Sequence, residues 1–290
     1  MPLPPKIVVS AIRPPGFSHS GAFDEVYEVL SMGLRQLGID VECVENAVSA
    51  EYPTIMFGGH LLAPEVLDSL PPTVVFYNLE QADPGAAWLA GPFPKAMQSH
   101  EVWDFSEINV RRLSQAGIAP RLLWCPIGFA DGLWRVPEAE EDIDVLFYGS
   151  LNQRRIDILH GLKAAGLNVV HSFGAYGKER DALIARAKVV LNVHYYESGI
   201  FEWVRVFYLL ANRKAVVSEE STLTAFDKGV DQVVHFAPYA GLIEACRALV
   251  ADSDARSRQI EQIPQYIAVR REDVILTSVM SSSWLSNIPV

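Results

Sequence analysis

The sequence predicts an α/β protein with two Rossmann-like domains facing each other across a cleft. Short apolar, β-branched runs alternate with amphipathic segments, which is typical of parallel sheets covered by helices on both faces. This alternation stops in an acidic stretch with prolines and glycines at 126–142 and then starts again. The length of 290 residues also suits two domains. We therefore expect an N-terminal domain at 1–132 and a C-terminal domain at 142–290, whose final helix could pack back on the first domain.

The first half contains segments whose residue patterns predict six strands and two helices. Apolar residues at three- and four-residue steps predict a helix from Ala22 to Gly38, and Ser106 resembles the N-cap of a helix at 107–115. The predicted strands lie at 6–10, 41–44, 54–57, 73–77, 102–105 and 121–125.

The second half repeats this rhythm. The predicted strands lie at 144–148, 168–171, 189–193, 215–218 and 232–236. The predicted helices lie at 154–165, 179–187, 201–211 and 242–251, and the tail from Gln259 onward also has helical spacing. In open parallel sheets ligands bind at the carboxyl ends of the strands, so we expect the chemistry in the loops that follow them.

Composition and net charge argue against several classes of protein and partner. Half of the residues are hydrophobic, a fifth are charged, and the formal net charge is −11, which indicates a globular chain and argues against a nucleic-acid or anionic-membrane partner. The first residues lack a signal peptide and no apolar run is long enough to span a membrane, so we expect a cytoplasmic protein. The three separated cysteines fit neither a disulfide framework nor a zinc site and are expected in the core.

The loop after the first strand of the second half has the residues of an anion site. Gly149 permits a sharp turn and a close backbone approach, and Ser150 and Asn152 follow it. Arg154 and Arg155 then open a helix, whose N-terminus favours anions and whose guanidinium groups suit phosphate. A plain turn followed by solvated helix residues explains the same pattern equally well.

Two further strand ends carry glycines and polar groups. Gly174 lies in the loop after the strand at 168–171, where a plain loop is the simpler interpretation. The strand at 189–193 leads into His194, the two tyrosines Tyr195 and Tyr196, and Glu197, a mixture of donors and acceptors that suits a sugar or ribose. For His194 alone, a core histidine is an equally good interpretation.

The order of these features over Asp144–Ser218 resembles the nucleotide-binding domain of B-type (GT-B) glycosyltransferases, in particular the "group 1" type that uses nucleotide sugars. The resemblance rests on five segments: Phe147 to Gly149 with the two arginines, Phe173-Gly174, Leu183 to Leu191, Glu197 to Gly199, and Asn212 to Ser218.

The resemblance implies a transferase that moves a sugar from a UDP-, GDP- or dTDP-sugar to a small-molecule, glycan or protein acceptor. It also implies retention of configuration, no metal ion and no further cofactor. Together with the loops it suggests these binding residues: Gly149, Ser150, Asn152, Arg154, Arg155, Gly174, His194, Tyr196, Ser198, Gly199, Glu202, Tyr208 and Glu219.

The last helix of this region departs from the family pattern. Relatives often have Arg-x-Phe-Glu, with the Glu on the nucleotide ribose, whereas here Tyr208 follows Arg205 and Phe207. Glu197 or Glu219 could supply the ribose contact instead. Arg205 could neutralise the leaving diphosphate, or it could form a surface ion pair with Glu202 at i to i+3.

Other segments match a functional pattern less specifically. Asp142-Ile-Asp144 and Asp252-Ser-Asp254 match the Asp-x-Asp metal signature only formally, because one precedes a strand and the other lies in a Ser-rich turn. In the first half, His19 and Glu80 follow strands and are candidate bases should the reaction invert configuration. Trp88, Phe93 and Trp103 could form a sugar platform, although such residues more often form core.

Three other functions compete with a transferase. A nucleotide-sugar epimerase uses the same architecture, but no convincing acid–base set is evident. A non-catalytic nucleotide-sugar-binding protein would account for Tyr208. A nicotinamide-dependent oxidoreductase is disfavoured, because a proline-led loop replaces Gly-x-Gly-x-x-Gly after the first strand.

Overall fold

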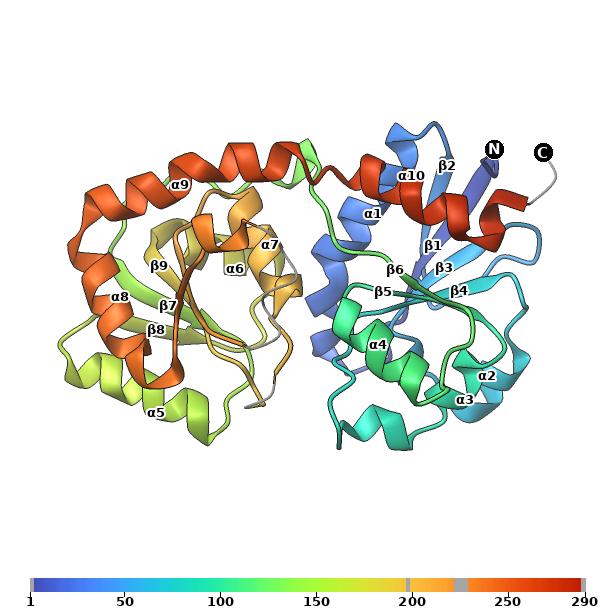
Figure 1. Ribbon diagram of the computed structural model, residues 1–290, viewed down its shortest axis with the longest axis horizontal. Helices are drawn as coiled ribbons and strands as arrows, with labels where there is room; N and C mark the ends of the chain where they lie inside the picture. Colours follow the sequence, from blue (N-terminus) through green and yellow to red (C-terminus); the bar gives the residue numbers. More distant parts are fainter. Residues whose placement is uncertain (1–2, 197–198, 222–228, 288–290) are drawn as a thin grey trace. The chain divides into compact units, whose positions relative to one another are not determined.

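The computed structural model describes residues 3–196, 199–221 and 229–287, and the chain divides into two compact units (Figure 1). Unit 1 comprises Met1–Ala130 with Arg270–Val290, and unit 2 comprises Asp131–Val269. Each unit contains one sheet in which every neighbouring pair of strands is parallel. The predicted class of two Rossmann-like α/β domains is confirmed.

Unit 1 has a six-stranded sheet in the order β2-β1-β3-β4-β5-β6. Its strands are β1 (Lys6–Ala11), β2 (Asp40–Glu45), β3 (Thr54–Phe57), β4 (Val74–Asn78), β5 (Glu101–Asp104) and β6 (Leu122–Trp124). Its helices are α1 (Asp24–Gln36), α2 (Pro64–Ser69), α3 (Phe93–Met97), α4 (Glu107–Gln115) and α10 (Glu272–Ser282). One core cluster joins β3, β4 and β5 to α2 and α3 through buried side chains such as Met56, Leu67 and Phe93.

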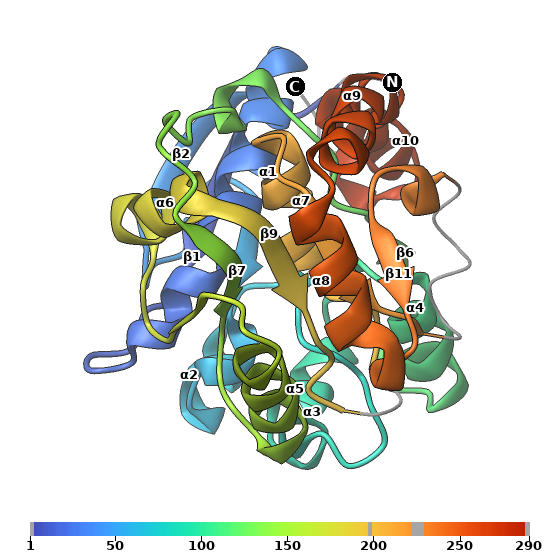
Figure 2. The ribbon, with the colours of Figure 1, turned by 90° about the vertical axis from the view of Figure 1, so that its left-hand side faces the viewer.

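Unit 2 has a five-stranded sheet in the order β11-β10-β9-β7-β8. Its strands are β7 (Ile143–Tyr148), β8 (Val169–Ser172), β9 (Ala187–Asn192), β10 (Val216–Glu219) and β11 (His235–Ala237). Its helices are α5 (Gln153–Ala164), α6 (Gly177–Arg186), α7 (Trp203–Ala211), α8 (Leu242–Ala251) and α9 (Ser253–Ala268). Apolar residues of α5 and α8 form one core cluster with the strands, and Figure 2 shows α8 next to β9.

Both sheets reverse their direction of growth at one point. In unit 1 the chain goes from β1 to the neighbouring β2 on one side, whereas from β3 it continues to the other side. Unit 2 does the same between β7 and β9. Connections that leave two adjacent strands in opposite directions open a crevice at the carboxyl ends of those strands, which is where ligands bind in such sheets. The loops after β1, β3, β7 and β9 are therefore the first places to look for a site.

The last helix of the chain belongs to unit 1. Helix α10 packs on α1, where Gly33 leaves room for the side chain of Glu272: a Cβ on Gly33 would lie 2.6 Å from Cγ of Glu272. The Glu272 carboxylate accepts a hydrogen bond of 2.6 Å from the N–H of Gly128. Buried Glu101 on β5 holds the segment after α10 by accepting hydrogen bonds from Ser283 Oγ and the N–H of Trp284. Two buried carboxylates thus hold the end of the chain on unit 1.

Most predicted elements agree with the structure to within two residues, and the exceptions have physical reasons. Helices α2 and α3 were not predicted, because six and five residues are too few to show a helical period. The strand predicted at 232–236 is shorter, since 230–232 form a 3₁₀ turn before β11. The helical tail consists of α9 and α10, separated at 269–271, and α9 begins at Ser253 rather than near Gln259.

Two smaller expectations are corrected. Cys43 lies exposed on the edge strand β2, whereas Cys125 and Cys246 are buried as expected. Asp252, assigned to a Ser-rich turn, is the N-cap of α9, and its side chain accepts a hydrogen bond of 2.8 Å from the N–H of Ala255.

Burial of Glu272 predicts a dependence of stability on pH. Burial raises the pKa of Glu272 to about 8, above its ordinary value in an unfolded chain, so its contribution to stability is full below about pH 4.5 and declines as the pH rises towards 8. Glu272→Gln cannot ionise. We expect the free energy of unfolding of this variant, minus that of the wild type, to increase by up to about 3 kcal/mol between pH 5.5 and 8.5, as measured by urea unfolding. Glu261→Gln, the same change at an exposed position of α9, should show no such trend. A difference between Glu272→Gln and the wild type that stays constant with pH would contradict the prediction.

Candidate functional site

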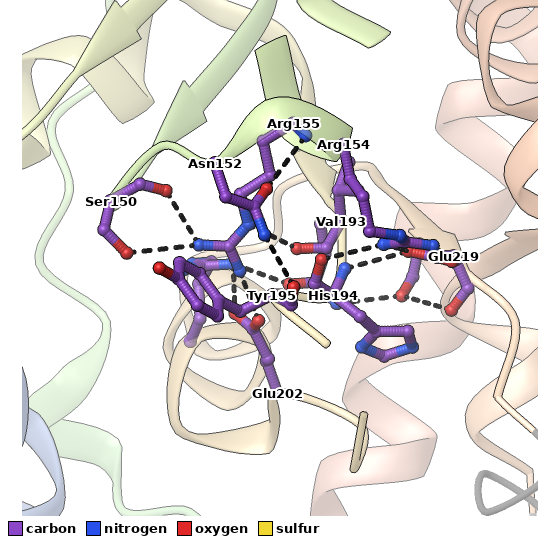
Figure 3. Close-up of polar contacts among 12 residues, drawn as sticks. Ser150, Asn152, Arg154, Arg155, Val193, His194, Tyr195, Glu202 and Glu219 are labelled. Carbon is purple, nitrogen blue, oxygen red and sulfur yellow. Dashed lines mark hydrogen bonds and ion pairs between the residues drawn. The ribbon is translucent and has the colours of Figure 1, made fainter. Parts of the chain in front are cut away.

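A cluster of charged side chains lies at the crevice of unit 2, where β7 and β9 end (Figure 3). It is built from the loop after β7, the first turn of α5, the segment after β9 and the start of α7. Three arginines and two glutamates meet there, which leaves a formal surplus of one positive charge. The sequence predicted these five residues individually, and the structure brings them together within one unit.

Gly149 allows one guanidinium group to lie directly against the backbone. Its φ of +137° is a conformation that side chains rarely adopt, and a Cβ at this position would lie 2.8 Å from Nη2 of Arg205 and 3.8 Å from Nη1 of Arg155. Nη1 of Arg205 donates a hydrogen bond of 2.7 Å to Asn192 Oδ1. No residue that the structure describes accepts a hydrogen bond from Nη2, so this end of Arg205 retains donors for a ligand.

Glu202 lies between two arginines. One of its oxygens is 2.5 Å from Nη2 of Arg155, and the other pairs with Nη1 of Arg205. Burial raises the pKa of the Glu202 carboxyl, but Arg205 and Arg155 outweigh burial, so the pKa is lowered overall. Arg155 is itself buried, and it also donates to the backbone oxygens of Val193 and Ser150, each at 2.9 Å. Arg155 therefore holds the loops after β7 and β9 together rather than pointing into solvent.

Arg154 forms a second, separate pair. Its guanidinium contacts both carboxylate oxygens of Glu219, at 2.5 and 3.1 Å, and donates to the backbone oxygen of His194 at 3.0 Å. Glu219, the last residue of β10, also accepts a hydrogen bond from the N–H of His194. The ring of Tyr239 lies 4.3 Å from the Arg154 guanidinium carbon. The backbone of His194 is thus fixed from both sides by one ion pair.

The ring of His194 has unused hydrogen-bonding capacity. The residue is buried, and neither ring nitrogen has a partner among the described residues. Burial lowers the pKa of His194, which keeps the ring neutral near pH 7, with one donor and one acceptor. In Figure 3 the ring points away from the pair of Arg155 and Glu202. A buried imidazole without partners is costly, which favours a polar ligand here.

The N-terminus of α5 adds backbone donors. Asn152 caps the helix by accepting a hydrogen bond from the N–H of Arg155, and its amide donates to the backbone oxygen of Tyr195 at 2.7 Å. The N–H groups of Ser150 and Leu151 have no acceptor among the described residues. These N–H groups lie in the loop just before the N-cap of a 12-residue helix, so they add to the attraction that the helix N-terminus and Nη2 of Arg205 exert on anions.

Other predicted site residues of unit 2 lie outside this cluster or outside the described residues. Tyr208 is buried in α7, where its hydroxyl donates to Asp181 at 3.0 Å and accepts from Arg135 at 3.1 Å. Gly174 has a φ of +82° in the loop after β8, with open space beside it. Glu197 and Ser198 are outside the described residues.

Two predicted residues flank that undescribed pair. Tyr196 is largely exposed, and its ring packs edge-on against Tyr195. Gly199 packs on His194, since a Cβ there would lie 3.0 Å from Cβ of His194.

The candidates from the first half lie in unit 1. The ring of His19 packs edge-on against Phe17 in the 3₁₀ segment before α1. Glu80 follows β4, and its carboxylate is 3.5 Å from Nε2 of His60. Of the three aromatic residues considered as a sugar platform, Phe93 and Trp103 are buried in the core.

Sequence reasoning missed two residues of the unit 2 cluster. Asn192 anchors Arg205, and Tyr239 donates to the backbone oxygen of Arg154 at 2.8 Å. Tyr195, one of the two tyrosines noted in the sequence, has its ring 5.2 Å from the Arg155 guanidinium carbon. Asn192 is the last residue of β9, so position alone could have found it. Tyr239 follows the edge strand β11 and gave no local signal.

The formal Asp-x-Asp matches are engaged in ion pairs. Asp142 pairs with Arg186 and Asp144 with Lys188, at 2.6 and 2.7 Å. Within the described ranges, no group of three or more His, Cys, Asp or Glu residues is arranged to hold a metal ion. Over those same ranges, no helix has the length and apolar character needed to cross a membrane.

Comparison with known sequences gives limited information. No family model matches the chain. Two uncharacterized proteins of Acanthamoeba polyphaga mimivirus are similar to it: one is 34% identical over 109 residues, which is 36% of this chain and 12% of that protein. The other is 27% identical over 150 residues, 51% of this chain and 49% of that protein. The matches thus span half or less of the length of these relatives.

Comparison with solved structures identifies the fold. HepE of Anabaena, in complex with UDP and glucose, has a TM-score of 0.63 at 12% identity and covers 97% of this chain and 99% of its own. WaaG, a glycosyltransferase involved in lipopolysaccharide biosynthesis, has a TM-score of 0.61 at 10% identity over 96% and 99%. Sucrose-phosphate synthase of Thermosynechococcus elongatus has a TM-score of 0.61 at 12% identity over 94% and 97%. The fold is that of GT-B glycosyltransferases, and the resemblance inferred from the sequence is confirmed at this level.

The position of Glu202 between two guanidinium groups predicts a large effect on stability. Glu202→Gln removes the negative charge that compensates both arginines. Arg155, whose side chain is only 3% exposed, then lies beside Arg205 without a counter-charge. We expect the variant to lose about 3 kcal/mol of unfolding free energy in urea. Glu244→Gln breaks the exposed pair with Arg247 and should cost less than about 1 kcal/mol. Equal effects of the two substitutions would show that the buried cluster does not depend on Glu202.

Proposed function

We propose that the protein is a glycosyltransferase that moves a sugar from a nucleoside-diphosphate sugar to an acceptor hydroxyl. The observation that carries this proposal is that Nη2 of Arg205 and the N–H groups of Ser150 and Leu151, all hydrogen-bond donors near Gly149, have no acceptor among the described residues. Donors of this kind at a helix N-terminus, next to a surplus positive charge, suit a diphosphate. The fold supports a nucleoside diphosphate as the ligand, since HepE has a similar fold and was crystallised with UDP.

The same donors suit the chemistry of transfer. When the glycosidic bond to the diphosphate breaks, negative charge grows on the leaving phosphate oxygen. Arg205 and the helix N-terminus provide fixed positive charge at that position, and Glu202 keeps Arg205 oriented. We propose that this replaces a metal ion, and that the leaving phosphate directs the acceptor to the same face of the sugar, with retention of configuration.

His194 and Glu219 are the proposed contacts for the remaining polar groups of the donor. The neutral ring of His194 can donate one hydrogen bond and accept another, as hydroxyl groups require. Arg154 fixes the Glu219 carboxylate beside it. Tyr208 takes no such role in this proposal, since its hydroxyl is already bonded to Asp181. The acceptor is proposed only as a hydroxyl-bearing small molecule, glycan or protein.

A substitution at Gly149 tests the diphosphate site. Gly149→Ala puts a methyl group 2.8 Å from the present position of Arg205 Nη2, which is too close, so the guanidinium must move. We expect the dissociation constant for UDP, GDP or dTDP, whichever binds the wild type best by calorimetry, to rise by about tenfold or more. Gly166→Ala is the matched control, because Gly166 also has a left-handed φ, +87°, but open space beside it. Equal affinities of Gly149→Ala and Gly166→Ala would rule out the proposed diphosphate site.

Catalysis is tested separately with a panel of UDP-, GDP- and dTDP-sugars. A transferase should release the nucleoside diphosphate, by transfer or by slow hydrolysis, and the rate should fall in Gly149→Ala. Conversion of the sugar without release would identify an epimerase, and binding without release a non-catalytic protein. Either outcome would contradict the proposed function.

A further inference from the structure

The backbone of Gly149 is held from one side by β8, an edge strand of the unit 2 sheet. The N–H of Gly149 donates to the backbone oxygen of Ser172 at 3.0 Å, which continues the parallel ladder of β7 and β8 by one hydrogen bond. The backbone oxygen of Gly149 is bound differently, because it lies 3.0 Å from Nε2 of His171. Both polar backbone groups of Gly149 are therefore bound by the last two residues of β8.

The contact with Gly149 determines which nitrogen of His171 carries the hydrogen. A carbonyl oxygen has no hydrogen to donate, so Nε2 is the donor and Nδ1 is the acceptor of the neutral ring. The ring is held against Phe147, with centroids 5.8 Å apart and planes inclined by 20°. Phe147 is fully buried, and the guanidinium carbon of Arg205 lies 5.6 Å from the centre of its ring. One buried ring thus supports both the imidazole and the arginine that lie against Gly149.

The hydrogen bond to His171 acts on the N–H of Ser150 through a rigid peptide unit. The structure contains no cis peptide bond among the residues it describes, so the oxygen of Gly149 and the N–H of Ser150 point in opposite directions in one plane. Fixing the oxygen on His171 therefore fixes the direction of the Ser150 N–H, which has no acceptor among the described residues. An anchor is needed here because a glycine permits many orientations of the peptide. A hydrogen bond accepted by the oxygen also polarises the peptide and strengthens its N–H as a donor.

We propose that His171 is a positioning residue for the diphosphate site: its Nε2–H holds the Gly149 oxygen and thereby directs the Ser150 N–H towards the ligand. This role rests on the proposed function, in which the ligand is a nucleoside diphosphate. A donor that already has the required direction binds an oxyanion without the cost of ordering the loop. His171 itself does not touch the ligand, so its whole effect passes through the peptide unit between Gly149 and Ser150.

Two substitutions separate the hydrogen bond from the packing of the ring. His171→Phe keeps an aromatic ring against Phe147 but has no donor, whereas His171→Gln keeps an N–H donor but loses the ring. We expect the dissociation constant for UDP, GDP or dTDP, whichever binds the wild type best by calorimetry, to rise about tenfold in His171→Phe and less than about threefold in His171→Gln. His160→Phe, the same substitution at an exposed position of α5, is the matched control and should bind as the wild type does. If His171→Phe binds as tightly as the wild type, or if His171→Gln binds no more tightly than His171→Phe, the positioning role is overturned.

The hydrogen bond itself is measured without a ligand, by NMR of the full chain with ¹⁵N-labelled histidine rings. His171→Gln assigns the ring signal of His171. We expect the ring nitrogens of His171 to show the Nε2–H tautomer and the Nε2–H proton to be visible, because a proton held in a hydrogen bond exchanges slowly with water. An Nδ1–H tautomer would overturn the positioning role whatever the nucleotide affinities are.

Failure of this role and failure of the proposed function have different signatures. A wild type that binds none of the three nucleoside diphosphates would refute the proposed function, and the role of His171 with it. A wild type that binds one of them, with weakened binding in Gly149→Ala but not in His171→Phe, would refute the role of His171 alone and leave the diphosphate site in place.

Discussion

The contact on which the unit 2 site depends is the carboxylate of Glu202 between Arg155 and Arg205. Two guanidinium groups repel each other, and burial of either one without a counter-charge is costly. Glu202 removes this conflict, because one carboxylate compensates part of both charges. Arg155 can then hold the loops after β7 and β9 from inside, while Arg205 lies against Gly149 with donors left over. The two arginines thus have unlike roles: the donors of Arg155 are used to hold the loops, whereas Arg205 keeps Nη2 donors without an acceptor among the described residues.

Both units meet the same topological constraint with different chemistry. A parallel sheet that grows in two directions leaves a crevice at the carboxyl ends of two adjacent strands. In unit 2 this place carries guanidinium groups and a helix N-terminus, which suit a phosphorylated ligand. In unit 1 the corresponding place carries His60 between aromatic rings, with the Glu80 carboxylate beside it. The two crevices therefore differ in charge: that of unit 2 has a surplus of positive charge, and that of unit 1 has an imidazole beside a carboxylate.

The fold could be predicted from local patterns, but the pairing within the sites could not. Apolar strands and glycine-terminated helices gave the α/β class, because burial on both faces leaves a direct trace in the sequence. Gly149 and Arg205 were likewise identifiable from their positions after a strand and on a helix. That Arg154 would pair with Glu219, 65 residues away, depends on which strands become neighbours, and no short pattern encodes that. The buried hydrogen bonds of Asp104 to Asn78 and Asn109 could not be predicted for the same reason, since these partners come from β4 and α4.

Tyr208 lies where the resemblance noted in the sequence implies a glutamate, and its contacts explain why a tyrosine fits there. Its hydroxyl bonds to Asp181, and the guanidinium carbon of Arg180 lies 4.4 Å from its ring. A glutamate at this position would bring a second carboxylate against buried Asp181, and the repulsion would be strong at low dielectric. Tyrosine satisfies Asp181 without adding charge, so the exchange is coupled to that neighbour rather than to the ligand. This position of α7 thus serves Asp181, whereas the carboxylates that act on His194 are those of Glu202 and of Glu219, which Arg154 fixes at the end of β10.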